Sequence, residues 1–168
     1  MLFRSKTELL VLHGKHRPKP SLVSITVGVA TVEPTSSARN IGAVFDDTMS
    51  FEEQVIEVWR TSFFHYRNIR RIRACLSIDS TKTLVHALET SLLDYCNAYL
   101  HGLPDYRIQR LQHIMNSAAK VVTCKRKFDH VTPLLIELHW LPVRQRIVLR
   151  SYIVQLEGIR WCDSNIHD

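Results

Sequence analysis

The spacing of apolar residues along the chain changes near residue 50. Before that point the apolar residues gather in three short runs: Thr7 to Leu12, Leu22 to Val27 and Val29 to Val32. Runs of this length that are separated by a glycine are typical of β-strands joined by a tight turn. Pro34, Ser36 and Ser37 interrupt the pattern, and Ile41 to Phe45 resumes it. We therefore expect three or four strands in one small antiparallel sheet, with a hairpin around Gly28.

From Ser50 onward the apolar residues recur at three- and four-residue spacing, which predicts helices. Ser50 and Glu53 form a capping-box pattern, in which each side chain accepts a hydrogen bond from the other residue's backbone N–H. The first helix is expected to begin there and to end near Leu76. Its apolar stripe, which is rich in aromatic residues and is predicted to pack in the core, consists of Val55, Trp59, Phe63, Tyr66 and Ile69.

Two further long helices follow. Asp79 and Ser80 are predicted to cap the second one, which continues to His101-Gly102. Its apolar stripe consists of Leu84, Leu88, Leu92 and Tyr95. Pro104-Asp105 is expected to open the third helix. The apolar seam of this helix is the best defined in the chain and consists of Ile108, Leu111, Met115, Ala118 and Val122.

The last part of the chain repeats one device for starting a helix. Thr132-Pro133 places a capping side chain before a proline, which predicts a short helix that ends at Trp140, and Pro142 predicts another helix after it. The pattern weakens after Leu156. The expected fold is α+β and mainly α, with a small N-terminal antiparallel sheet followed by a bundle of four to five helices. The expected division is a β segment at 1–48, a helical domain at 49–158 and a frayed tail at 159–168.

Composition narrows the choice of partners. The chain has 22 Lys and Arg against 16 Asp and Glu, a net charge of +6 and a pI near 9.4, which favours a polyanionic partner. The four cysteines are too far apart for a zinc site or a redox motif, so we expect reduced thiols and an intracellular location, in the cytoplasm or the nucleus. No apolar run is long enough to span a membrane, so no membrane partner is expected.

Several strings resemble, in order, the C-terminal half of reverse transcriptases from jockey-like and other LINE-type (non-LTR) retrotransposons. They are KTELL (6–10), RNIGAVFD (39–46), MSF (49–51), FHYRNI (64–69), LDYCN (93–97), GLP (102–104), RLQ (110–112), FDHVTP (128–133) and LHWLPV (138–143). The resemblance covers about Ser5 to Leu149. This chain departs from the family at Ala43, at Trp59 and after Leu156.

The resemblance implies a place in the polymerase for each part of the chain. Residues 1 to about 48 would be the rim of the palm, and the helices would be the thumb and the connection beyond it. The active-site hairpin would lie upstream of Met1. Lys6 matches a lysine that approaches the incoming triphosphate and is assigned a proton-donating role in the family. The parent polymerase would need Mg²⁺.

The residues themselves predict no catalytic centre. Two-metal phosphoryl transfer needs at least two carboxylates that hold ions about 4 Å apart. The chain has no aromatic-x-Asp-Asp hairpin and no upstream partner aspartate; Asp46-Asp47 directly follows Phe45 and is predicted to end a strand and cap a helix. His13 and His16 have no further ligand at a suitable spacing, and no serine has the glycines of a nucleophile elbow. We expect no catalytic residue, no metal site and no cofactor.

Basic side chains are the remaining functional candidates. The candidates for binding a phosphate backbone are Lys6, Arg67, Arg70, Arg71, Arg73, Arg107, Arg110, Lys125, Arg126 and Lys127. An equally good alternative for the helical arginines is a solvated helix face. The leading hypothesis is a reverse transcriptase remnant without polymerase activity that binds RNA or an RNA–DNA hybrid regardless of sequence.

Two other functional classes stay open. The second hypothesis is a helical protein-interaction or self-association module, because thumb helices that have lost their partners would expose apolar faces. The third, weaker hypothesis takes the helices at 79–101 and 105–124 as a helix-turn-helix for duplex DNA, but Arg107 and Arg110 are too few side chains to read bases.

Overall fold

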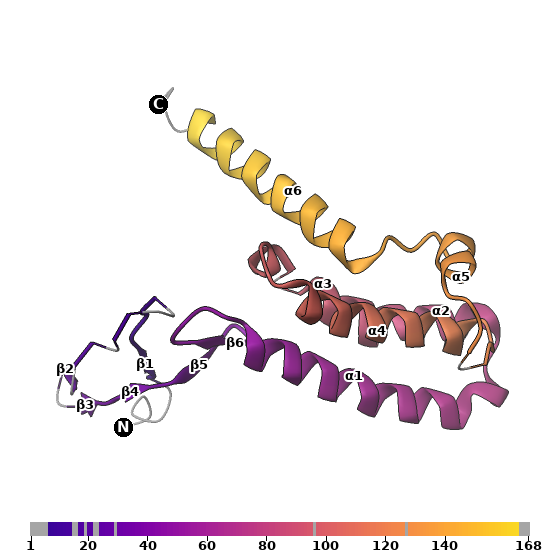
Figure 1. The fold of residues 1–168 in the computed structure, drawn as a ribbon, viewed down its shortest axis with the longest axis horizontal. Helices are drawn as coiled ribbons and strands as arrows, with labels where there is room; N and C mark the ends of the chain where they lie inside the picture. Colours follow the sequence, from indigo (N-terminus) through magenta and orange to yellow (C-terminus); the bar gives the residue numbers. More distant parts are fainter. Residues whose placement is uncertain are drawn as a thin grey trace. The chain divides into compact units, whose positions relative to one another are not determined.

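The computed structural model describes residues 7–164 except 15, 16, 19, 22, 23, 29, 96 and 127, so Lys6 and Lys127 lie outside the described residues. The chain forms two compact units, Met1–Gln54 and Val55–Asp168. The first unit contains short strands and the second contains helices, as Figure 1 shows. The α+β, mainly α fold class is therefore confirmed.

The strands of the first unit form three separate pairs. β1 (Leu9–Leu10) lies parallel to β4 (Pro34–Thr35). The other two pairs are antiparallel: β2 (Ile25–Val27) with β3 (Ala30–Val32), and β5 (Ser37–Asn40) with β6 (Ala43–Asp46). The expected hairpin around Gly28 is present, and this glycine has the positive φ of 64° that its turn requires. The expected single antiparallel sheet was wrong.

The strand predicted at Ile41 to Phe45 is present as β6, but it begins two residues later than expected, at Ala43. Ile41 and Gly42 both have positive φ, 49° and 83°, and they connect Asn40 to Ala43 as the two central residues of a hairpin turn of the I′ kind. Ile41 is 83% exposed, so its apolar side chain marks the turn and not the start of a strand. β5 has no alternating apolar pattern, and its pairing depends on β6.

Asp46 joins the end of β6 to the start of α1 (Glu52–Ile72). Its carboxylate accepts hydrogen bonds from the Thr48 hydroxyl (2.7 Å), the Ser50 amide (2.8 Å) and the Phe51 amide (2.7 Å). The predicted role of Asp46 at a strand end and helix cap is thereby confirmed. The predicted capping box is not formed, because the backbone N–H of Ser50 donates to Asp46 and not to Glu53. The Ser50 hydroxyl instead accepts from the Glu52 amide, at 3.4 Å.

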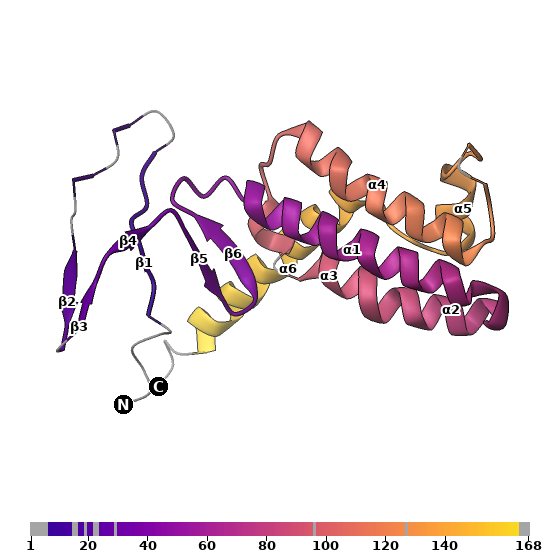
Figure 2. The same cartoon turned by 90° about the horizontal axis from the view of Figure 1, so that it is seen from below.

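In the second unit, α1 and α4 (Asp105–Val122) run in the same direction. The Tyr66 hydroxyl donates to the carbonyl of Ile114, and the Arg73 guanidinium donates to the carbonyls of Val121 and Val122. Both connections join residues 48 or 49 positions apart, which requires parallel helices. Figures 1 and 2 show the two helices side by side. All five predicted seam residues of α4 are buried.

The segment between these helices is helical from Ile78 to Asp94 with a π-helical turn inside it, and the helix ends at Asp94 and not at His101-Gly102 as expected. The segment consists of α2 (Ile78–Val85), a π-helical turn (His86–Thr90), α3 (Ser91–Asp94) and a 3₁₀ turn (Asn97–Leu100). Ser77 is the N-cap, in place of Asp79 or Ser80, and its hydroxyl accepts from the Ser80 amide. Of the predicted apolar stripe, Leu84, Leu88 and Leu92 are half-buried and Tyr95 is exposed. The residues that the segment buries most fully are Thr81, Val85, Thr90, Leu93, Asn97 and Leu100.

Two helices complete the unit. α5 (Thr132–Glu137) has Pro133 in its first turn as predicted, although Thr132 lies within the helix and Val131 occupies the cap position. α6 (Val143–Ser164) extends six residues beyond residue 158, the expected end of the helical domain. The described part of the chain contains no helix with the length and apolar character needed to cross a membrane.

The Asp46 cap predicts a pH-dependent stability. Burial raises the pKa of the Asp46 carboxyl, but hydrogen bonds from Thr48, Ser50 and Phe51 outweigh burial and hold the pKa below its ordinary value. The carboxylate therefore stabilises the fold above the unfolded pKa of about 3.9, and this stability is lost as the pH falls through the lower folded pKa. We expect Asp46→Ala to reduce the free energy of unfolding by about 1–2 kcal/mol at neutral pH.

Urea unfolding followed by circular dichroism would measure this loss at pH 7 and in acid. The difference between the parent protein and Asp46→Ala should shrink once the pH is below the folded pKa. Asp79→Ala, which removes an exposed carboxylate from the first turn of α2, is the control. An equal loss at both pH values would contradict the proposed role of the Asp46 charge.

Candidate nucleic-acid interface

The parallel arrangement of α1 and α4 brings two predicted basic clusters to one end of the helical unit. Arg70 and Arg71 lie in the last turn of α1, and Lys125 and Arg126 directly follow α4. Because Arg73 joins the end of α1 to the end of α4, the two clusters lie at the same end (Figures 1 and 2). We call the exposed residues Arg67, Arg70, Arg71, Lys125 and Arg126 the basic end.

Local structure presents these side chains to solvent. Arg67 and Arg71 are one helical turn apart, on the side of α1 opposite the buried Ser62 and Ile69. After α4, the Lys125 amide donates to the Lys120 carbonyl at 3.0 Å, which closes the end of the helix. The Arg126 amide donates to the Asp129 carboxylate at 2.7 Å. Backbone contacts thus hold the loop while its basic side chains extend outward.

Helix electrostatics give part of the reason for this concentration of charge. The C-terminal end of a helix carries a partial negative charge from its unsatisfied carbonyl groups, and nearby cations are stabilising. Two helices that end together double the number of such groups. α1 has the matching distribution, with Glu52 and Glu53 in its first turn and Arg70 and Arg71 in its last. The basic end therefore has a structural role as well as an exposed charge.

Arg73 belongs to the core of this end and not to its surface. It is half-buried in the 3₁₀ turn Arg73–Cys75, and its three guanidinium nitrogens donate to the carbonyls of Val121 (3.0 Å), Leu76 (2.8 Å) and Val122 (2.9 Å). Carbonyls at the end of a helix need such donors. We therefore leave Arg73 out of the interface.

The two candidates in the first turns of α4 lie elsewhere. Arg107 is only 7% exposed, with its guanidinium carbon 5.4 Å from the centre of the Tyr106 ring. Arg110 is exposed, but it lies toward the opposite end of α4 from the basic end. With Arg107 buried, one of the two side chains of the helix-turn-helix hypothesis cannot reach a base edge.

The aromatic stripe of α1 was predicted to be core, and this was wrong for two of its members. Tyr66 is buried, but Trp59 and Phe63 are 44% and 38% exposed, and their rings contact each other at a tilt of 45° with centres 4.5 Å apart. The buried face of α1 instead contains the smaller Val58 and Ser62. After α5, His139 is exposed and Trp140 is half-buried.

The acidic pair of the first unit is engaged in the fold. Asp46 accepts the hydrogen bonds described above, and the Asp47 carboxylate lies 3.6 Å from Nε2 of His13. Among the residues that the structure describes, no group of three His, Cys, Asp or Glu side chains is arranged to hold a metal ion.

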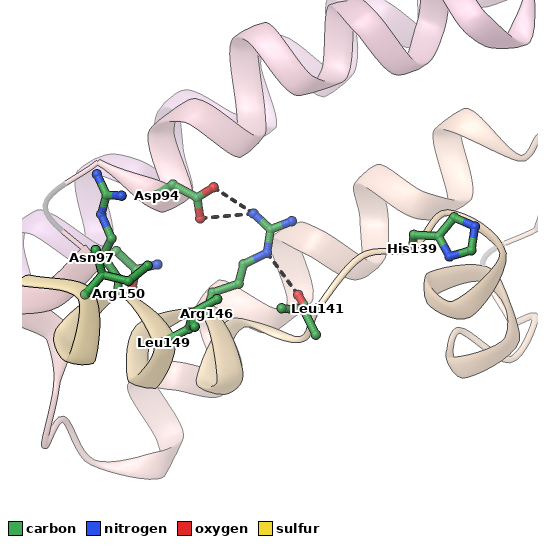
Figure 3. A pocket seen from close by; sticks show the side chains of 8 residues that line it. Asp94, Asn97, His139, Leu141, Arg146, Leu149 and Arg150 are labelled. Carbon is green, nitrogen blue, oxygen red and sulfur yellow. Dashed lines mark hydrogen bonds and ion pairs between the residues drawn. The ribbon is translucent and has the colours of Figure 1, made fainter. Parts of the chain in front are cut away.

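No sequence signal marked a second basic group, in the first turns of α6. Nη1 of Arg146 lies 3.0 and 2.8 Å from the two carboxylate oxygens of Asp94, and Arg150 follows one turn later (Figure 3). Arg144 pairs with Asp105. The acidic partners Asp94 and Asp105 are far from these arginines in the sequence. The ion pairs, and the pocket that Arg146 and Arg150 line, are therefore visible only in the folded chain.

The contacts of Arg73 predict a loss of stability that the exposed arginines would not share. We expect Arg73→Met to reduce the free energy of unfolding by about 1–3 kcal/mol, because the α4 carbonyls lose buried donors. Arg70→Met, on the same segment but exposed, should change it by less than about 0.5 kcal/mol. Chemical unfolding of both variants would test this, and equal losses would show that Arg73 has no special structural role.

Comparison with known proteins adds no support to the resemblance. No family model, curated protein or solved structure matches this chain. The likeness to LINE-type reverse transcriptases therefore remains a prediction that rests on the ordered strings from 6–10 to 138–143.

Proposed function

We propose that this chain is part of a LINE-type reverse transcriptase and that its helical unit is a thumb-like segment that binds the backbone of RNA or an RNA–DNA hybrid. The observation that carries the proposal is the basic end, to which α1 and the loop after α4 both contribute. The resemblance of the strings in both units to the family is the second support.

The chemistry of the basic end suits a phosphate backbone. Its five members are exposed cations, and arginine and lysine contacts to phosphate hold a nucleic acid without reading its bases. The contact between Arg126 and the Asp129 carboxylate is made by the backbone amide of Arg126 and does not use its guanidinium group. A thumb that follows a growing duplex needs this kind of sequence-tolerant contact. The net charge of +6 favours the same class of partner.

Salt dependence is the direct test of this binding. If the five side chains contact phosphates, the logarithm of the affinity for an RNA–DNA hybrid should fall with the logarithm of salt concentration with a slope of roughly −4 to −5. Arg70→Gln with Arg71→Gln should make this slope shallower by about 2 units. Fluorescence anisotropy of a labelled hybrid, between about 50 and 200 mM salt, would measure both.

A matched control removes the same charge near the other end of α4, with one change on α4 and one on α6. Arg110→Gln with Arg144→Gln should leave the slope close to that of the parent protein, since Arg144 pairs with Asp105 at the start of α4. No binding, or binding without a salt slope, would exclude the nucleic-acid function. Hybrids of unrelated sequence should bind equally well.

We propose further that the chain alone does not polymerise. The sequence has no aromatic-x-Asp-Asp hairpin, and the oxygens of Asp46 already accept three hydrogen bonds. A primer-extension assay with the purified chain, Mg²⁺ and all four deoxynucleotides should yield no extended product. Extension that depends on Mg²⁺ and disappears in Asp46→Asn with Asp47→Asn would overturn this proposal.

A second candidate function is self-association or binding of another protein. It is favoured by the exposed apolar side chains of α6, where Leu149, Tyr152, Val154 and Leu156 are all largely exposed, and by Trp59, Phe63 and Phe64 on α1. Large exposed apolar surfaces commonly mark interaction sites. This function would be preferred if the hybrid titration shows no binding while light scattering shows a mass that increases with protein concentration.

A further inference from the structure

A pocket of about 340 Å³ lies between α6 and the segment that contains the end of α3 and the 3₁₀ turn Asn97–Leu100 (Figure 3). All the residues that line it belong to the helical unit. Its volume is within the range of about 300–1,000 Å³ that is usual for sites that bind small molecules. No sequence pattern predicted this pocket, and no residue of the basic end lines it.

The ion pair between Arg146 and Asp94 fixes one wall of the pocket. Besides the contacts of Nη1 with both Asp94 oxygens, Nε of Arg146 donates to the carbonyl of Leu141 at 3.0 Å. These contacts hold the guanidinium in one orientation before any ligand arrives. The two charges also largely cancel, so this pair alone gives the pocket no preference for an anion or a cation.

Arg150 determines the net charge of the side chains that line the pocket. It is exposed at the rim, one turn of α6 after Arg146, and it forms no hydrogen bond or ion pair with any other residue that the structure describes. Because the neighbouring pair is neutral overall, the pocket has a net positive charge. An anionic group such as a phosphate would be attracted to Arg150, and a guanidinium can donate two hydrogen bonds to it.

Asn97 supplies an independent observation that points to a ligand. The residue lines the pocket although it is only 2% exposed, and its amide oxygen is buried without a hydrogen-bond partner among the described residues. Leaving such an acceptor unsatisfied costs about 1–3 kcal/mol. A ligand N–H group would satisfy this oxygen once a small movement of the Asn97 side chain exposes it to the pocket. An amide has an acceptor next to a donor, the pattern that pairs with the edge of a nucleobase.

The remaining lining is mainly apolar. Leu141, Leu149 and Ile153 line the pocket beside the polar groups, together with His139. A planar ring placed there would be covered by aliphatic side chains on its face while its edge reaches Asn97. The pocket therefore combines a cation, an amide edge and an apolar surface.

We propose that this pocket binds a nucleotide, with the base at Asn97 and the phosphate at Arg150. The nucleotide can be a free nucleoside monophosphate or an unpaired nucleotide of a bound strand, and the strand-borne form rests on the proposed nucleic-acid function. The site is separate from the basic end, which contacts only backbone.

Calorimetric titration of the full chain with AMP, CMP, GMP and UMP tests the free form. We expect at least one to bind, and both Asn97→Leu and Arg150→Gln to weaken that binding about tenfold or more. Arg144→Gln, the same charge change on the same helix outside the pocket, should have no effect. Asn97→Leu removes a buried acceptor that has no partner, and Arg150→Gln is an exposed change, so thermal unfolding should show neither variant to be less stable than the parent protein.

Two labelled hybrids, one blunt and one with unpaired nucleotides at an end, test the strand-borne form. A preference for the unpaired end that both pocket variants abolish supports it, and free binding without this preference assigns the pocket to free nucleotides. Loss of hybrid binding in the Arg70→Gln, Arg71→Gln protein with unchanged nucleotide binding separates this site from the basic end. The proposal is wrong if no monophosphate binds and neither hybrid is preferred, or if the pocket variants bind as the parent protein does.

Discussion

The connection of α1 to α4 is the constraint on which the helical unit depends. The Tyr66 hydroxyl and the Arg73 guanidinium both reach carbonyl groups of α4, and they do so at points two turns apart on each helix. Two such contacts fix the direction of the helices and the position of one along the other. Since the helices are parallel, the chain between them must return along their length, which it does through α2, the π-helical turn and α3 (Figure 2).

This arrangement determines where the charges lie. Parallel helices that end together concentrate unsatisfied carbonyl groups at one end, and Arg73 satisfies some of them from inside. The exposed cations at that end offset the remaining partial charge and are also available to a polyanion. Ion pairs hold the first turns of α6 to other parts of the unit, Arg146 to Asp94 and Arg144 to Asp105. The pocket lies between these turns of α6 and the segment that contains Asp94 and Asn97.

Local features of the fold could be predicted from the sequence, and features that depend on distant partners could not. Pro104, Pro133 and Gly28 act within a few residues, and their predicted effects were confirmed. The apolar seam of α4 was also correct, because this helix buries a wide face that includes nine of its 18 residues. On α1, several stripes have the same period, and burial of Val58 and Ser62 in place of Trp59 and Phe63 depends on how closely another helix can approach. The separate roles of Arg67, Arg73 and Arg107 likewise depend on carbonyls and rings that no local pattern reveals.

The turn between β5 and β6 has a consequence for the order of folding. Ile41 adopts a left-handed conformation that costs a β-branched residue roughly 1–2 kcal/mol, so this turn opposes formation of the hairpin. The compensating contacts join β6 to the start of α1. The Val44 amide donates to the Gln54 side chain at 2.8 Å, and the Asp46 carboxylate accepts from the amides of Ser50 and Phe51. The hairpin and the first turn of α1 must therefore form together, and neither is expected to persist in a peptide that lacks the other.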